Sequence, residues 1–136
     1  MIFKTQLLHP SEIEKAFVEV MIDLHAIVVF DSVDALPKSW RIRSHDLYGP
    51  LPSIEIGNKD DPSAVLERIG REACKLYAIS RLRERISEMF PGLTFMPPTL
   101  TEQGVVVGVS NERQTVLAEG ADFLAAYHVL RSKGGG

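Results

Sequence analysis

Apolar residues recur at helical spacing between residues 11 and 25. Ser11 and Glu14 stand at the start of this stretch with the spacing of a capping box, in which each side chain satisfies a backbone amide of the first helical turn. The apolar positions share one face and are expected to be buried; they are Ile13, Ala16, Phe17, Val20, Met21 and Leu24. The pattern predicts a helix over residues 11–25.

Three short segments that follow have the pattern of β-strands. Residues 26–30 form a β-branched apolar run that Asp31 ends, which predicts a buried strand. Residues 39–44 alternate between apolar and polar side chains, and residues 53–57 do the same, as half-buried strands do. Together they predict a small antiparallel sheet, whose strand order the sequence leaves open.

A long helix is predicted from Pro62 to Phe90, with Asp61 as its N-cap. Its apolar face changes direction by about a third of a turn along its length. The first direction contains Val65, Leu66, Ile69, Ala73, Leu76 and Tyr77, and the second contains Ile79, Leu82, Ile86, Met89 and Phe90. Two interpretations follow: different neighbours cover one long helix, or the helix bends or breaks near residues 78–80.

The last third of the chain contains a strong strand candidate at residues 104–109. Two interpretations of residues 110–131 remain open at this point. Either the whole segment is helical, or residues 114–118 pair back as a hairpin before a helix over residues 121–131. Gly120 inside a helix would cost about 1 kcal/mol relative to alanine, which favours the hairpin.

The composition is that of one folded domain. The 136 residues are 45% hydrophobic and 24% charged, which is ordinary for a globular chain that folds without disulfides. We therefore expect an α+β fold, with one small, mainly antiparallel sheet of roughly four to six strands covered by about three helices. A single domain is predicted over residues 1–132, followed by a glycine-rich tail at residues 133–136.

The charge and the cysteine content indicate which cellular compartment and which classes of partner to expect. The formal net charge of −3 leaves no electrostatic footprint for nucleic acid. Cys74 is the single cysteine, so a reducing compartment is expected. The first residues lack the pattern of a secretory signal, and no apolar stretch is long enough to span a membrane. These features predict a cytoplasmic protein without membrane contact.

The most chemically varied stretch lies around the second predicted strand. Two guanidinium groups on one strand face can bind a phosphate or a carboxylate, and a nearby imidazole can transfer a proton. The candidate ligand-binding residues are Arg41, Arg43, His45, Asp46 and Tyr48. The simpler interpretation is that the two arginines form the solvated face of a half-buried strand.

No other pattern indicates catalysis or metal binding. The histidines are scattered through the chain and lack the spacing of metal ligands; they are His9, His25, His45 and His128. Cys74 lies in the middle of a predicted helix, at the edge of its apolar stripe, where an inert and partly buried cysteine is usual. We expect no catalytic residue, no metal and no cofactor.

The leading functional hypothesis is a small non-catalytic protein-interaction module, such as an adaptor, an inhibitor or an accessory subunit. The second apolar stripe of the long helix suggests more apolar surface than one neighbour covers. Its candidate contacts with a protein partner or a second copy of the chain are Ile79, Leu82, Ile86 and Phe90. The alternatives are an enzyme or ligand-binding domain for a small anionic substrate at residues 41–48, and a nucleic-acid-binding protein.

Overall fold

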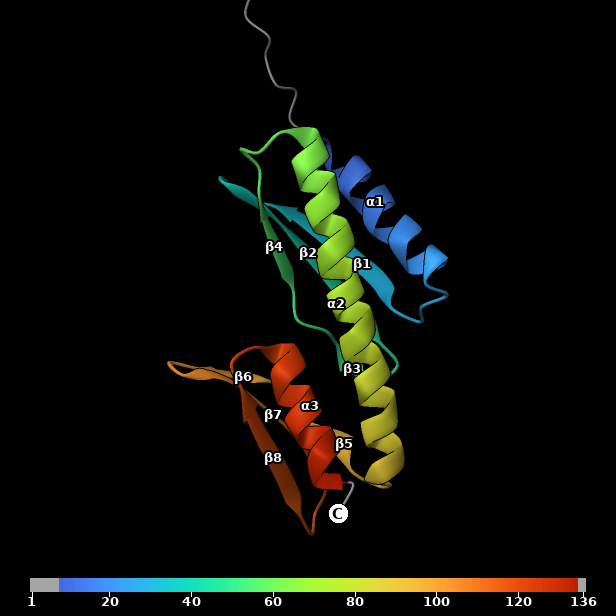
Figure 1. Ribbon diagram of the computed structural model, residues 1–136, viewed down its shortest axis with the longest axis vertical. Coiled ribbons are helices and arrows are strands. Elements are labelled where there is room, and N and C mark those ends of the chain that lie inside the picture. Colours follow the sequence, from blue (N-terminus) through green and yellow to red (C-terminus); the bar gives the residue numbers. More distant parts are fainter. Residues whose placement is uncertain (1–7, 135–136) are drawn as a thin grey trace, which may run out of the picture. The chain divides into compact units, whose positions relative to one another are not determined.

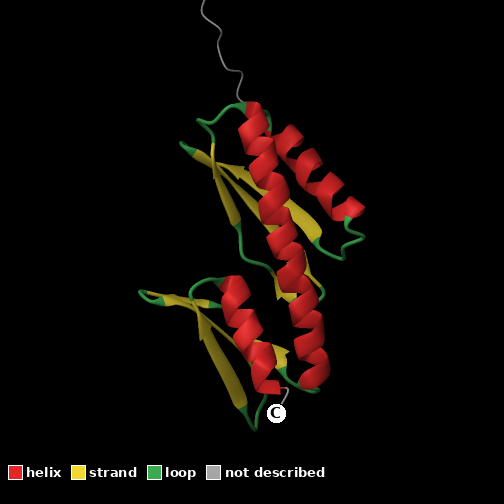
Figure 2. Ribbon diagram, viewed as in Figure 1, coloured by secondary structure: helices red, strands yellow, loops and turns green. Residues whose placement is uncertain are grey.

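The computed structural model describes residues 8–134, which form three helices and eight short strands (Figure 1; Figure 2). The predicted α+β class is confirmed. The strands form two separate antiparallel sheets where one was expected. The chain divides into two compact units, the first ending at Tyr77 and the second beginning at Ala78. A single cooperative domain over residues 1–132 stays a prediction, and Gly135 and Gly136 of the predicted tail lie outside the described residues.

In the first unit, helices lie on one face of a four-stranded sheet (Figure 1). Central strand β2 pairs with β1 on one side and with β3 and β4 on the other. The strands are β1 (Val29–Ala35), β2 (Ser39–Asp46), β3 (Gly49–Pro50) and β4 (Ile54–Gly57). Trp40 and Ile42 are buried on the face of β2 that carries the helices, and Arg41 and Arg43 lie on the other face. The alternation predicted for this strand is confirmed.

Helix α1 (Pro10–Asp23) begins with a capping box that is shifted from the predicted one. The N–H of Ser11 donates to Nδ1 of His9 at 3.2 Å, and Oε2 of Glu12 accepts from the N–H of His9 at 3.3 Å. The predicted box of Ser11 and Glu14 is therefore wrong. Pro10 explains the shift, because its fixed φ suits the first helical position and its missing N–H needs no partner there.

The same helix ends in a Schellman motif with a histidine at the left-handed position. His25 has φ 51°, its N–H donates to the carbonyl of Ile22 at 3.0 Å, and the N–H of Ala26 donates to the carbonyl of Met21 at 2.9 Å. Glycine usually occupies this position, because a left-handed conformation costs other residues about 1–2 kcal/mol. His25 is thus held in an unfavourable conformation at the turn that leads into β1.

Strand β1 differs from the buried strand predicted at residues 26–30. It begins at Val29, which is 50% exposed, and it continues through Asp31 to Ala35. The pairing register shifts at Asp31, which marks a β-bulge. Among the described residues β1 pairs only with β2, so it is an edge strand, where charged side chains are tolerated. Asp31 therefore does not end the strand, and residues 26–28 have no partner strand within residues 8–134.

Helix α2 (Pro62–Met89) is continuous across the boundary between the units, so of the two interpretations the single long helix is confirmed. Oδ1 of Asp61 accepts from the N–H of Ala64 at 3.0 Å, which confirms the N-cap. The buried apolar residues before the boundary are Val65, Ile69, Ala73 and Leu76, and those after it are Ile79, Leu82 and Ile86. The change in direction of the apolar face coincides with the boundary.

The second unit contains the other four-stranded sheet, the end of α2 and helix α3 (Phe123–Gly134), which packs on β7 and β8. Its strands are β5 (Thr94–Phe95), β6 (Thr99–Thr101), β7 (Gly104–Ser110) and β8 (Thr115–Gly120). Strand β7 pairs with each of the other three. The hairpin interpretation of residues 110–120 is confirmed. Helix α3 begins two residues later than predicted, because Asp122 caps it by accepting from the N–H of Ala125 at 2.8 Å.

We expect Gly120→Ala to lower the free energy of unfolding by about 1–3 kcal/mol. A β-carbon at Gly120 would overlap backbone atoms of Ala125 and Ala126, which cannot move without disturbing α3. The control is Gly70→Ala in α2, where a β-carbon meets nothing within 4 Å and stability should rise by about 0.5–1 kcal/mol. Urea unfolding followed by circular dichroism measures both, and an equal effect of the two substitutions would contradict the packing at Gly120.

We expect His25→Gly to raise the free energy of unfolding by roughly 0.5–1 kcal/mol, because glycine adopts a positive φ without a β-carbon penalty. The matched control is Lys15→Gly in the exposed middle of α1, which should lower stability by about 0.5–1 kcal/mol. The same unfolding measurement compares them. A loss of stability in both variants would argue against the left-handed turn at His25.

Candidate functional site

The outer face of the first sheet carries three cross-strand charge pairs. Arg41, Arg43 and His45 project from this face of β2, as the alternation predicted. Each lies against a carboxylate from a neighbouring strand. The pairs are Arg41 Nη2 with Glu55 Oε2 at 3.8 Å, Arg43 Nε with Asp34 Oδ2 at 2.7 Å, and His45 Nδ1 with Asp31 Oδ1 at 2.5 Å. The basic side chains of the predicted ligand site are thus matched by acidic partners within the sheet.

Asp46 and Tyr48 contact each other at the end of β2. Asp46 is buried on the opposite face of β2, and its Oδ1 accepts from the N–H of Tyr48 at 2.8 Å. That bond holds the turn that Gly49, with φ 114°, completes. The carboxylate that contacts His45 is Asp31. Sequence analysis treated Asp31 only as the end of a strand, and no sequence signal reveals a contact that depends on strand register and a bulge.

A shallow hollow of about 490 Å³ lies over this charged face. Its charged lining consists of Arg41, Arg43, Asp31 and Glu55, so two cations face two carboxylates. The carboxylates beside Arg41 and Arg43 offset part of the positive charge that would attract an anionic ligand. Among residues 8–134, no group of three histidine, cysteine, aspartate or glutamate side chains is arranged to hold a metal ion. The charge pairs suit cross-strand stabilisation of the sheet.

The residues of the long helix that sequence analysis assigned to a partner surface lie elsewhere than expected. Ile79, Leu82 and Ile86 are buried within the chain, and Phe90 is half-buried. This placement corrects the prediction, because the chain's own residues already cover Ile79, Leu82 and Ile86. Cys74 also differs from expectation, since it is exposed on α2.

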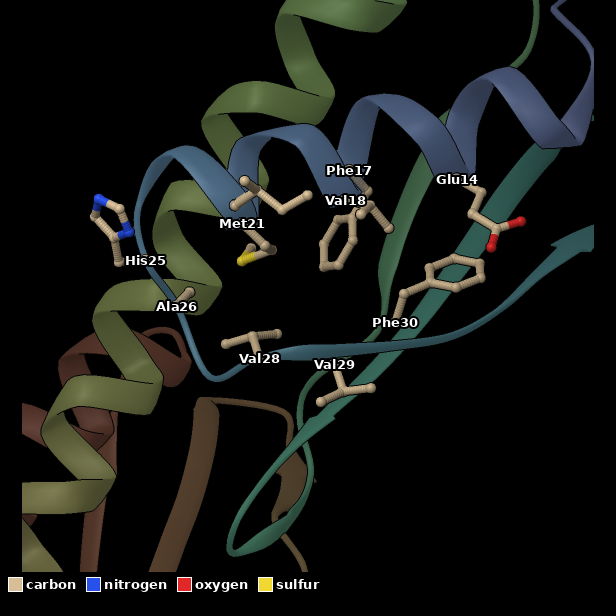
Figure 3. A pocket seen from close by; sticks show the side chains of 10 residues that line it. Glu14, Phe17, Val18, Met21, His25, Ala26, Val28, Val29 and Phe30 are labelled. Atoms are coloured by element: carbon tan, nitrogen blue, oxygen red, sulfur yellow. The ribbon is translucent and has the colours of Figure 1, made fainter.

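An open apolar groove of about 400 Å³ lies between α1 and the start of β1 (Figure 3). The rings of Phe17 and Phe30 are 6.1 Å apart and lie between the helix and the strand. The other apolar residues along the groove are Val18, Met21, Ile22, Ala26, Val28 and Val29. Its ionisable residues are Glu14 and His25, which lie at opposite ends (Figure 3).

Aliphatic side chains stand exposed at this groove and beside it. The exposed fractions are 65% for Ile22, 54% for Ile27 and 50% for Val29. Val29 lies opposite His45 in the strand register, so its side chain projects from the charged face and away from α1 (Figure 3). We name the groove, together with Val18 and Ile22 of α1, the α1–β1 patch. An exposed aliphatic side chain next to an apolar groove is typical of an interaction site. Sequence analysis missed the patch because residues 26–30 read as a buried strand, whereas the structure places them at an open edge.

Comparisons with models of known protein families, with curated proteins and with solved structures found no match to the chain. In the part of the chain that the structure describes, no helix combines the length and apolar character needed to cross a membrane. The function is therefore argued from the two surface regions described above, the charged face and the α1–β1 patch.

We expect Arg43→Ala to lower the free energy of unfolding by no more than about 1 kcal/mol, because the side chains of Arg43 and Asp34 are 55% and 36% exposed and solvent screens their pair. The neighbouring substitution Ile42→Ala, on the buried face of the same strand, should cost about 2–5 kcal/mol. Chemical unfolding of the two variants tests the assignment. A loss above about 2 kcal/mol for Arg43→Ala would show that the charged face does more than stabilise the sheet surface.

Proposed function

We propose that this chain is a small non-catalytic protein-interaction module and that it binds a protein through the α1–β1 patch. The single observation that carries the proposal is the open apolar groove, along which Ile22 is 65% exposed. An adaptor, an inhibitor and an accessory subunit are all consistent with such a module.

The energetics of the patch support this proposal. Complete burial of a valine or isoleucine side chain contributes about 1.5–3 kcal/mol. Ile22 is 65% exposed, so covering it would contribute roughly 1–2 kcal/mol. Contacts made inside the groove would add to this amount. A partner would need the area of an ordinary interface to offset the cost of association as well.

The remaining surface features give less support to the alternatives. An anion-binding enzyme would need free cations, and both Arg41 and Arg43 lie against carboxylates. A nucleic-acid-binding protein usually has an excess of positive charge, and the formal net charge here is −3. A cytoplasmic location suits the single cysteine, because a reducing compartment keeps Cys74 free.

Photocrosslinking from position 22 tests the proposed function. We expect a chain with benzoylphenylalanine at Ile22 to form one major protein adduct in a nuclease-treated native lysate, because this side chain would contact the partner directly. Excess wild-type chain should compete with the adduct, and excess Ile22→Glu chain should not.

The control carries the same crosslinker at Val129, an exposed aliphatic position on α3, and should not form that adduct. Failure of position 22 to crosslink to any protein, including the chain itself, would contradict the proposed function.

A further inference from the structure

We propose that the partner bound by the α1–β1 patch is a second copy of this chain. A two-fold axis beside α1 would set the two α1 helices antiparallel and cover both grooves. This inference rests on the proposed function, because it names the partner of the same surface. Three observations carry it: the shape of the patch, the charges at its ends and the turn at His25.

The shape of the patch meets the requirement of a two-fold interface. In such an interface the same surface meets itself, so it must supply both the cavity and the side chains that fill it. The α1–β1 patch contains an apolar groove lined by Phe17 and Phe30, and it also carries the exposed side chain of Ile22. Each copy can therefore offer an aliphatic side chain to the groove of the other.

The charges at the ends of the groove specify the antiparallel arrangement. Glu14 and His25 lie at opposite ends, roughly 16 Å apart along α1 at about 1.5 Å per residue (Figure 3). A two-fold axis between them brings Glu14 of each copy opposite His25 of the other, where an imidazole N–H can donate to the carboxylate. Val18 and Ile22 of both copies then meet between the two polar contacts. A parallel arrangement would instead oppose Glu14 to Glu14.

The backbone at His25 is an independent observation that favours a role for its side chain. Its φ of 51° costs free energy that glycine would avoid, and such conformations are concentrated at functional positions. The motif also orients the side chain, because bonds from the N–H groups of His25 and Ala26 fix the turn. A contact with Glu14 of the other copy gives the histidine a function that glycine cannot supply.

Sedimentation equilibrium of the full chain tests the proposal directly. We expect the wild type to reach twice the chain mass of 15.1 kDa as its concentration rises. Ile22→Glu places two carboxylates in the apolar centre and should weaken association by about 100-fold or more. Val129→Glu, on an exposed face of α3, should associate as the wild type does. A wild type that stays monomeric to about 1 mM, or a dimer that Ile22→Glu leaves unchanged, would overturn the proposal.

A crosslinking experiment keeps the proposal testable if Ile22→Glu fails to fold. In a Cys74→Ser background, Glu14→Cys and His25→Cys in one chain should give a covalent dimer on mild oxidation, because the two positions face each other only between copies. Each single cysteine variant should give little dimer. Equal crosslinking by either single variant would refute the antiparallel arrangement.

The outcomes separate this inference from the proposed function. If the chain is monomeric and position 22 crosslinks to a different protein, the second copy is the wrong partner and the interaction module stands. If the chain is monomeric and position 22 crosslinks to no protein, both proposals fail. A dimer lost in Ile22→Glu, together with a self-adduct from position 22, supports both.

Discussion

The fold depends on helix α2, whose buried apolar face changes direction along its length. Helix α2 buries Val65, Ile69 and Leu76 before the boundary between the units, and it buries Ile79 and Ile86 after it. Each sheet is half-buried and needs apolar helix surface on one face only. A helix with a single straight stripe would supply that surface to one sheet along its whole length. The shift in phase lets the same continuous helix contribute to the core of both units.

The two edges of the first sheet differ in how well they are covered. On one side of β2, strand β4 adds Ile54 and Ile56 to the core. On the other side, β1 pairs only with β2 among the described residues, and the groove between α1 and β1 leaves apolar side chains open. The left-handed turn at His25 brings the chain from the helix to this edge. The interaction surface therefore arises where the sheet ends, and the core of the unit is complete without it.

The charged face shows that a cluster of basic residues in the sequence does not identify a ligand site until the register of strand pairing is known. Arg41, Arg43 and His45 share a strand face, as their alternation indicates. Their partners come from β1 and β4 through tertiary pairing, and the bulge at Asp31 brings a carboxylate to His45. Arg41, Arg43 and His45 are thereby each placed against a carboxylate of the sheet. The α1–β1 patch carries fewer reactive groups, and Ile22 is 65% exposed there.

The features that the sequence determined by itself follow from interactions between residues close together in the chain. Helical periodicity identified α1, α2 and α3, the alternation at residues 39–44 predicted the faces of β2, and the cost of Gly120 in a helix favoured the hairpin. These features depend on neighbours within a few residues. Tertiary structure alone decided that there are two sheets, that Ile79, Leu82 and Ile86 are core, and that residues 26–30 lie at an edge. An apolar run indicates only that burial is favourable, whereas which surface buries it depends on strand pairing between distant segments.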